Sequence, residues 1–253
     1  MTLFRLITFL LNLPIVYLKS RNIDLLSFEQ RFTILKKLCL SIIKQWGIKL
    51  KVKISDKIDI NEPYYLVSNH QGTFDPIFLI ASSPVAHSFI SKEENLKIPI
   101  IGTWGKKIEF ITFNRTDFED NVQMLRQSMR FLKERKSLLV FPEGTRSRSD
   151  QMLEFKPGAL LPAYGAKVKI IPVTLTHSYK MDRFKEKVSE ICVTYHDPID
   201  YVDYKPLNYQ ECSDLIKNIS QKPICVKTKL EIQNNDTTFE TINIKSIEVI
   251  PSF

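Results

Sequence analysis

His70 and Asp75 are the first side chains of the sequence that can do chemistry together, in the segment NHQGTFDP. On an ideal helix a separation of five residues rotates by about 500°, so the chain must turn to pair them. Gly72 permits a turn, and Asp75 before Pro76 is suited to cap a helix that begins there. An imidazole bonded to a carboxylate through one nitrogen can remove a hydroxyl proton with the other. The pair indicates a general base, and the alternative is a helix cap beside a packed histidine.

A second candidate site lies in the segment FPEGTRS at 141–147, where a buried-looking strand ends. Gly144 would let backbone amides approach a ligand closely, and Arg146 can hold a phosphate through two parallel hydrogen bonds. Glu143 can accept hydrogen bonds from ligand hydroxyl groups or orient the arginine. The alternative is a solvated turn with an ordinary ion pair between Glu143 and Arg146.

Alternating strands and helices must position these residues. One helix is expected from Pro76, and another from a capping box of Thr116 and Glu119, with Phe118 on its apolar face. Buried strands are expected at 64–69, 107–113, 137–141, 168–176 and 190–196. The pattern favours an α/β fold with a central mixed sheet flanked by helices and reactive residues in loops at strand ends.

The N-terminal region holds the positive excess of the chain. The formal net charge is +8, and residues 1–53 carry ten lysines and arginines against two acidic residues. An uncharged apolar segment at 6–18 is shorter than the roughly 20 residues that a membrane span requires, and is expected to lie in an interface. A short charged region follows, after a second helix, up to Tyr64. Basic and apolar residues side by side favour an anionic phospholipid surface over nucleic acid.

The second expected helix, at 27–47, has apolar residues at helical spacing with basic residues between them. These apolar residues are Phe28, Phe32, Leu35, Cys39, Ile42, Ile43 and Trp46. With the preceding segment, this pattern predicts an amphipathic two-helix membrane-docking element on the cytoplasmic face of a membrane. The alternative is a helix that caps the core, with Trp46 packed inside and the lysines solvated.

Two functional classes find no support in the sequence. The four cysteines and four histidines form no CxxC or HExxH pattern, so no metal site is expected. No nucleic-acid-binding motif is present either, and no nucleic acid partner is expected.

Four segments in order, NHQGTFDP, ITFNRTD, FPEGTRS and KIIPVTLT, resemble the four sequence blocks of the glycerolipid acyltransferase family. The resemblance covers residues 64–176. It implies that His70 is the general base and Asp75 its partner. It also implies an acceptor-phosphate site formed by Arg115, Glu143, Gly144, Thr145 and Arg146. The sequence does not identify the donors to the oxyanion of the reaction, and backbone amides near Gly72 are candidates.

The activity that this resemblance implies is acyl transfer from acyl-CoA or acyl-ACP, the co-substrate, without a cofactor. The acceptor would be the sn-2 hydroxyl of 1-acyl-glycerol 3-phosphate (lysophosphatidic acid), and the product phosphatidic acid. A glycerol-3-phosphate or other lysophospholipid acyltransferase is the alternative within the class. Outside it, the alternative is an inactive membrane-binding module.

Three sections of chain are expected. Residues 1–50 would form the membrane-docking helices, residues 51–220 the α/β acyltransferase domain, and residues 221–253 a C-terminal extension of unknown role. The stretch at 235–250 suggests an added strand within that extension.

Overall fold

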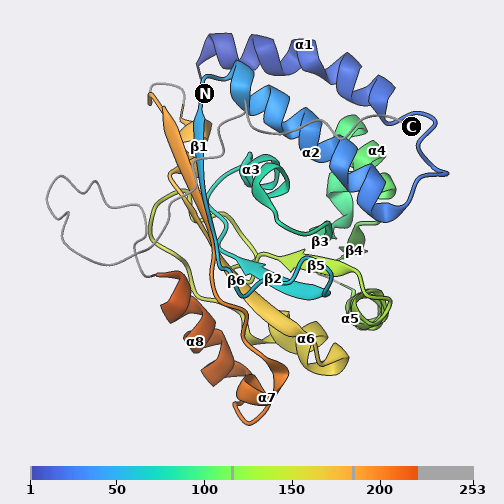
Figure 1. Cartoon of the computed structure of the whole chain (residues 1–253), viewed down its shortest axis with the longest axis vertical. Coiled ribbons are helices and arrows are strands. Elements are labelled where there is room, and N and C mark those ends of the chain that lie inside the picture. The colour runs from blue at the N-terminus through green and yellow to red at the C-terminus, as the bar shows by residue number, and fades with distance from the viewer. Residues whose placement is uncertain (1, 115–116, 184–185, 222–253) are drawn as a thin grey trace, which may run out of the picture.

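The computed structural model describes residues 2–114, 117–183 and 186–221 (Figure 1). The strand expected at 235–250 lies outside the described residues. The strands are β1 Lys49–Ile54, β2 Tyr64–Ser68, β3 His87–Lys92, β4 Ile111–Phe113, β5 Ser137–Val140, β6 Lys169–Thr176 and β7 Glu190–Tyr195. The α-helices are α1 Leu3–Lys19, α2 Phe28–Gln45, α3 Asp75–Ser82, α4 Pro99–Lys107, α5 Phe118–Lys133, α6 Leu161–Ala166, α7 Tyr201–Tyr204 and α8 Tyr209–Ser220. Short 3₁₀ helices are η1 Glu93–Lys97, η2 Pro157–Leu160 and η3 Ser178–Asp182.

The strands form a mixed sheet with helices on both faces. In the described part of the chain their order is β1-β7-β6-β2-β5-β3-β4. Only β6 and β7 pair antiparallel, and the other neighbours are parallel. Figure 1 shows α1, α2 and α3 over one face and α5, α6 and α8 over the other. The predicted α/β fold with a central mixed sheet is therefore confirmed.

Three neighbouring strands place the candidate site. β2 lies between β5 and β6 and runs parallel to both, so Val67 has Val140 on one side and Pro172 on the other. β2 and β5 are buried along their whole length, as expected of strands covered on both faces. Because parallel strands end at one edge of the sheet, the loops that follow β2, β5 and β6 meet there.

Two strands were missed and one was predicted too long. β1 lies in the predicted charged region, where lysines alternate with Leu50, Val52 and Ile54, and this period of two matches a strand. No strand was predicted at the position of β3. The strand expected at 107–113 is extended only from Ile111, because α4 continues to Lys107 and Glu109 has a left-handed φ of 58°.

The helix α5 begins one residue later than the predicted capping box implies. Asp117 is its N-cap and accepts hydrogen bonds from the amides of Glu119 and Asp120. Thr116 lies outside the described residues. Phe118, predicted on the apolar face, is exposed, whereas Phe131 and Leu132 near the helix end are buried.

The apolar face of α2 packs on the core, so the prediction that this face docks on a membrane is wrong. All seven residues named for it are buried, and Trp46 is 2% exposed. They belong to one hydrophobic cluster with the strands. Lys36 donates a hydrogen bond to the carbonyl of Ser83. A capping box of Ser27 and Gln30 starts the helix.

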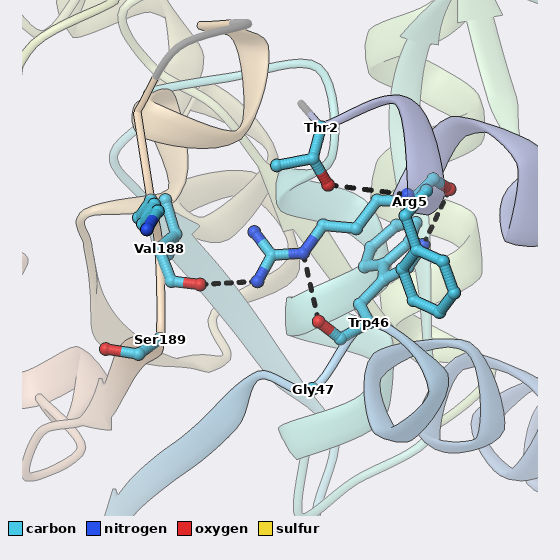
Figure 2. Close-up of a pocket in the computed structure, with 8 residues that line it drawn as sticks. Thr2, Arg5, Trp46, Gly47, Val188 and Ser189 are labelled. Carbon is cyan, nitrogen blue, oxygen red and sulfur yellow. Dashed lines mark hydrogen bonds between the residues drawn. The ribbon is translucent and has the colours of Figure 1, made fainter.

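Arg5 anchors the start of α1 to the protein. Figure 2 shows its guanidinium in a pocket, donating to the carbonyl of Trp46 at 2.9 Å and that of Val188 at 2.6 Å. In return, the Trp46 indole N–H donates to the Arg5 carbonyl at 3.1 Å. Further along, the indole N–H of Trp104 donates to the carbonyl of Val16. These hydrogen bonds attach one side of α1 to the rest of the protein, and the other side of the helix faces outward.

Buried His87, at the start of β3, makes the fold sensitive to acid. Its ring packs between Phe32 and Phe89, and Nε2 has no hydrogen-bond partner in the described part of the chain. Burial lowers the pKa of His87 to about 3, and the charge of Lys36 acts in the same direction. As the pH falls, the histidine is therefore protonated in the unfolded chain before it is protonated in the folded one. The free energy of unfolding decreases as the pH falls from about 6.5 towards 3.

We expect His87→Leu to remove much of this acid sensitivity. Urea denaturation at pH 7 and pH 4.5 should show that the variant loses about 2 to 3 kcal/mol less of its free energy of unfolding than the parent. His177→Asn, at a left-handed position that is not fully buried, is the control and should follow the parent. Equal losses in His87→Leu and the parent would contradict this role of His87.

Candidate active site

The loop after β2 brings His70 and Asp75 together, as the spacing predicts. His70 Nδ1 lies 2.8 Å from Asp75 Oδ2. Asp75 is not the N-cap, however, because α3 begins at Asp75 itself and Phe74 holds the cap position. The carboxylate turns back towards the loop instead of capping the helix. The alternative of a helix cap beside an unrelated histidine does not match this geometry.

Asp75 is fully buried and accepts hydrogen bonds on both oxygens. Oδ2 also accepts from the amides of Gln71 at 2.6 Å and Gly72 at 2.9 Å, while Oδ1 accepts from Ser178 Oγ at 2.6 Å. Four donors compensate the burial of one charge. The amides expected to serve an oxyanion near Gly72 are therefore occupied, and that of Thr73 donates to Asp182. These three candidate amides are not free to serve an oxyanion, because the loop turns them towards carboxylates of the protein.

The ring of His70 is held in a defined plane with one nitrogen available. It stacks on Phe141 with centroids 4.0 Å apart and an interplanar angle of 18°. Nδ1 faces Asp75, and the described residues offer no hydrogen-bond partner to Nε2. The side chain is 19% exposed. A carboxylate on Nδ1 favours the tautomer whose Nε2 can accept a proton.

Glu143 joins the two predicted sites through hydrogen bonds to backbone amides. It is 3% exposed, and its two oxygens accept from the amides of His70 at 2.7 Å and Leu153 at 2.8 Å. Burial raises the pKa of Glu143, and these amide hydrogen bonds act against that rise. No ion pair joins Glu143 to Arg146 among the described residues, and hydrogen bonding of Glu143 to a ligand stays a prediction. Glu143 holds the backbone of His70.

The loop after β5 lies against the loop of His70. The amides of Ser147 and Arg148 donate to the carbonyls of His70 and Gln71 at 2.8 and 3.1 Å. Gly144 turns the chain with a φ of 67°, a value that favours glycine. Thr145 and Arg146 are exposed beyond that turn.

Arg146 reaches the loop of His70 and Asp75, where its guanidinium donates to the hydroxyl of Thr73. The alternative ion pair between Glu143 and Arg146 is not among the ion pairs of the described residues. Arg115, the other predicted phosphate ligand, lies outside the described residues. The exposed guanidinium of Arg146 thus lies beside the His70 loop. The described residues contain no group of three or more side chains suited to hold a metal.

Several residues at this edge could not be identified from the sequence. Asn69 pairs with the backbone of Leu175 on β6 through both atoms of its amide, at 2.8 and 2.9 Å. Ser178 and Asp182, in the 3₁₀ helix after β6, bond to Asp75 and Thr73. Asn69 is next to the histidine in the sequence, and this position could have marked it as a candidate. Ser178 and Asp182 are more than a hundred residues away from it, and no local pattern points to them.

The arrangement can accept a proton and bind an anion. A histidine oriented by a buried carboxylate presents a free ring nitrogen, which suits it to remove a hydroxyl proton. Arg146 supplies a positive charge with planar donors that match a phosphate. Together they suit a phosphorylated alcohol whose hydroxyl group reacts as a nucleophile.

Comparison with known proteins agrees with this chemistry. The acyltransferase family model matches residues 49–176. A probable 1-acyl-sn-glycerol-3-phosphate acyltransferase of Mycoplasma genitalium is 30% identical over 241 residues, covering 85% of this chain and 89% of that protein. The human 1-acyl-sn-glycerol-3-phosphate acyltransferase alpha is 30% identical over 168 residues, covering 66% of this chain and 57% of its own length.

A solved structure shares the fold. The 1-acyl-sn-glycerophosphate (LPA) acyltransferase PlsC from Thermotoga maritima superposes with a TM-score of 0.71 at 22% identity, covering 87% of this chain and 91% of that one. The family match, the relatives and the edge of the sheet where His70 and Asp75 meet all point to one conclusion. The chain belongs to the glycerolipid acyltransferase family and is an acyltransferase similar to the 1-acylglycerol-3-phosphate O-acyltransferases.

Proposed function

We propose that the protein transfers a fatty acyl group from an acyl thioester to the sn-2 hydroxyl of 1-acyl-glycerol 3-phosphate, forming phosphatidic acid. The observation that carries the proposal is the 2.8 Å contact of His70 Nδ1 with buried Asp75, which leaves Nε2 available, while Arg146 reaches Thr73 of the same loop. The names of the relatives support the choice of acceptor, since they are called 1-acyl-sn-glycerol-3-phosphate acyltransferases. The acyl thioester is acyl-CoA or acylated acyl carrier protein, and the scheme requires no cofactor.

Proton transfer to His70 starts the reaction. Nε2 takes the proton of the sn-2 hydroxyl as that oxygen forms a bond to the thioester carbonyl carbon. Asp75 stabilises the imidazolium that results. The tetrahedral intermediate then collapses, the carbon–sulfur bond breaks, and the thiolate leaves and takes up the proton from His70. No covalent acyl-enzyme forms, so neither a serine nor a cysteine nucleophile is needed.

Arg146 binds the acceptor phosphate in this scheme, and the family resemblance adds Arg115, Gly144 and Thr145 as proposed ligands of that phosphate. A bound phosphate holds the sn-2 hydroxyl at a fixed distance from Nε2. Proton transfer between them then takes place within one complex and needs no further encounter in solution. Glu143, whose oxygens both accept from backbone amides, holds the backbone of His70.

We expect Arg146→Ala to raise the acceptor KM by about 10- to 100-fold with a smaller change in kcat, because a phosphate bound equally in the ground and transition states affects binding alone. Steady-state kinetics with lysophosphatidic acid as the varied substrate measure this. Arg126→Ala, at an exposed position of α5, is the control and should keep the parent KM. An unchanged KM in Arg146→Ala would remove Arg146 from the site.

Membrane docking through α1 completes the proposal. None of the described helices is both long and apolar enough to cross a membrane. One side of α1 nonetheless exposes large apolar residues: Leu3, Phe4, Ile7, Leu10, Leu11, Ile15, Tyr17 and Leu18. An amphipathic helix with such a face lies in the plane of a membrane interface. We place this face in the anionic phospholipid surface on the cytoplasmic side, where the lysophosphatidic acid lies.

Leu11→Asp is expected to weaken binding to phosphatidylglycerol vesicles by roughly tenfold or more, because it puts a charge where an apolar side chain would be buried. Leu11 is 69% exposed, so the fold should tolerate the change. Val202→Asp is the matched control, since Val202 on α7 is 64% exposed at the other end of the molecule (Figure 1). Sedimentation with vesicles measures both variants, and equal loss in the two would contradict docking through α1.

One assay separates the proposed activity from its alternatives. Radiolabelled acyl transfer is measured with lysophosphatidic acid or glycerol 3-phosphate as acceptor, each with acyl-CoA or acyl carrier protein as donor. The proposal requires lysophosphatidic acid to be acylated faster than glycerol 3-phosphate by at least one donor. Preference for glycerol 3-phosphate would reassign the acceptor. Vesicle binding without transfer from either donor would indicate an inactive membrane-binding module.

A further inference from the structure

The 3₁₀ helix η3, Ser178–Asp182, packs against the loop that joins His70 to Asp75. Gly72 lies close to both ends of η3. A Cβ atom added there would lie 3.2 Å from the carbonyl oxygen of Ser178 and 3.3 Å from Oδ2 of Asp182. This separation is tighter than usual side-chain contact, so the loop packs closely on η3 at a residue without a side chain. The two ends of η3 then contact different parts of the candidate site.

Ser178 forms the first end and fixes the Asp75 carboxylate. Its Oγ is 2.6 Å from Asp75 Oδ1 and 3.2 Å from Gln71 Oε1, and its amide donates to Gln71 Oε1 at 3.1 Å. Because the carboxylate is closer and charged, it receives the hydroxyl proton. Asp75 Oδ2 receives His70 Nδ1 at the same time. Ser178 is fully buried and thus sets the rotation of the group that orients His70.

Asp182 forms the second end and fixes Thr73. Its Oδ2 accepts from the Thr73 amide at 2.9 Å and from the Thr73 hydroxyl at 3.1 Å. A carboxylate only accepts, so the hydroxyl proton points to Asp182, and the lone pairs of the oxygen are left for the Arg146 guanidinium. No ion pair joins Asp182 to Arg146 in the described part of the chain. The carboxylate therefore acts on Arg146 through the direction of the Thr73 hydroxyl.

We propose that η3 is a positioning element of the reaction, in which Ser178 holds Asp75 and Asp182 holds Arg146 through Thr73. The inference rests on the proposed function, in which His70 is the base and Arg146 binds the acceptor phosphate. Neither Ser178 nor Asp182 touches the substrate. Each end of η3 serves one half of the site, so each should affect a different kinetic parameter.

The Asp182 end is tested by removing either partner of the hydrogen bond. Asp182→Ala and Thr73→Val should each raise the acceptor KM by about tenfold with kcat close to the parent, which is the effect of one charge-assisted hydrogen bond. The double variant should be no worse than either single variant, because both break the same chain of bonds. Asp182→Asn should restore the parent KM, since its amide oxygen still accepts from Thr73. Asp182 and Thr73 are exposed, so these variants should fold.

The Ser178 end is tested with Ser178→Ala. It should lower kcat by about tenfold and leave the acceptor KM unchanged, because one of the four hydrogen bonds to Asp75 is lost. Asp203→Ala, at an exposed position of α7, is the control for both ends and should match the parent. Melting temperatures are measured for every variant alongside the kinetics.

Arg146→Ala separates failure of the inference from failure of the proposed function. If it leaves the acceptor KM unchanged, the phosphate site itself is wrong and the role of Asp182 falls with it. If it raises KM while Asp182→Ala and Thr73→Val do not, Asp182 does not position Arg146 and the inference is overturned. The inference is overturned as well if the two ends of η3 change kcat and KM together in step with a lower melting temperature. That outcome would be the result of a structural role.

Discussion

Replacing His70 by alanine is expected to lower kcat by about 100- to 10,000-fold, which is the usual contribution of a general base. The physical reason is the loss of Nε2, the ring nitrogen that has no partner among the described residues and receives the hydroxyl proton. The backbone of His70 stays tied to Glu143 and Ser147, so the loop should keep its conformation. Acyl transfer to lysophosphatidic acid measures the change.

Vesicle binding should be unchanged in His70→Ala, since α1 lies outside the substitution. The melting temperature should fall only slightly, because three of the four donors to Asp75 remain. Ser68→Ala is the comparison at a nearby position. Ser68 is buried in β2, and its hydroxyl donates to the Asn69 carbonyl, so it is not placed to act as a nucleophile. Turnover should survive its removal. A His70→Ala variant with near-parent kcat, or an inactive Ser68→Ala variant of normal stability, would contradict the proposed mechanism.

Asp75→Asn is expected to lower kcat by about 100- to 1,000-fold while the protein stays folded. The amide oxygen of Asn can take the place of Oδ2, which accepts hydrogen bonds from His70, Gln71 and Gly72. The NH₂ group then takes the place of Oδ1 and can donate to Ser178 Oγ. The hydrogen bonds are thus retained, and only the charge that stabilises the imidazolium is lost. Single-turnover acyl transfer measures the chemical step directly.

Asp150→Asn is the matched control for this variant. Asp150 also contacts the loop, through the Gln71 side chain at 3.4 Å, and accepts from the Tyr179 hydroxyl at 3.0 Å, but it does not touch His70. Its loss of charge should leave turnover close to that of the parent. Equal losses of rate in the two variants would mean that Asp75 acts through the general field of the site and not through the pair with His70.

The sequence predicted the central strands well because each contains a run of apolar residues, at 64–67 in β2, 138–140 in β5 and 170–173 in β6. β2, β5 and β6 lie within one residue of the predicted ends at both termini, and buried parallel strands produce such runs. β1 was missed because its lysines alternate with apolar residues and read as a charged region. β4 was predicted too long because α4 continues into the same apolar stretch, which periodicity over a few residues cannot divide.

The N-terminal helices show why an amphipathic pattern does not say what covers its apolar face. Both a membrane and a protein core bury an apolar stripe, so the spacing of Phe28, Phe32 and Trp46 fitted either. The structure packs that stripe on the core. Of these two helices, α1 is the one that exposes large apolar residues. The sequence had grouped α1 and α2 as one element.

Residue types and spacing made His70, Asp75 and Arg146 candidates, because a histidine, a carboxylate and an arginine carry their chemistry wherever they are placed, and the resemblance of four segments to one family assigned their predicted roles. Only the tertiary structure decided their partners. Glu143, predicted at the phosphate, holds the His70 backbone, and Ser178 and Asp182 hold Asp75 and Thr73. The physical reason is that strand order places the ends of β2, β5 and β6 at one edge. Hydrogen bonds made there across about a hundred residues depend on packing of the whole sheet, which no local pattern records.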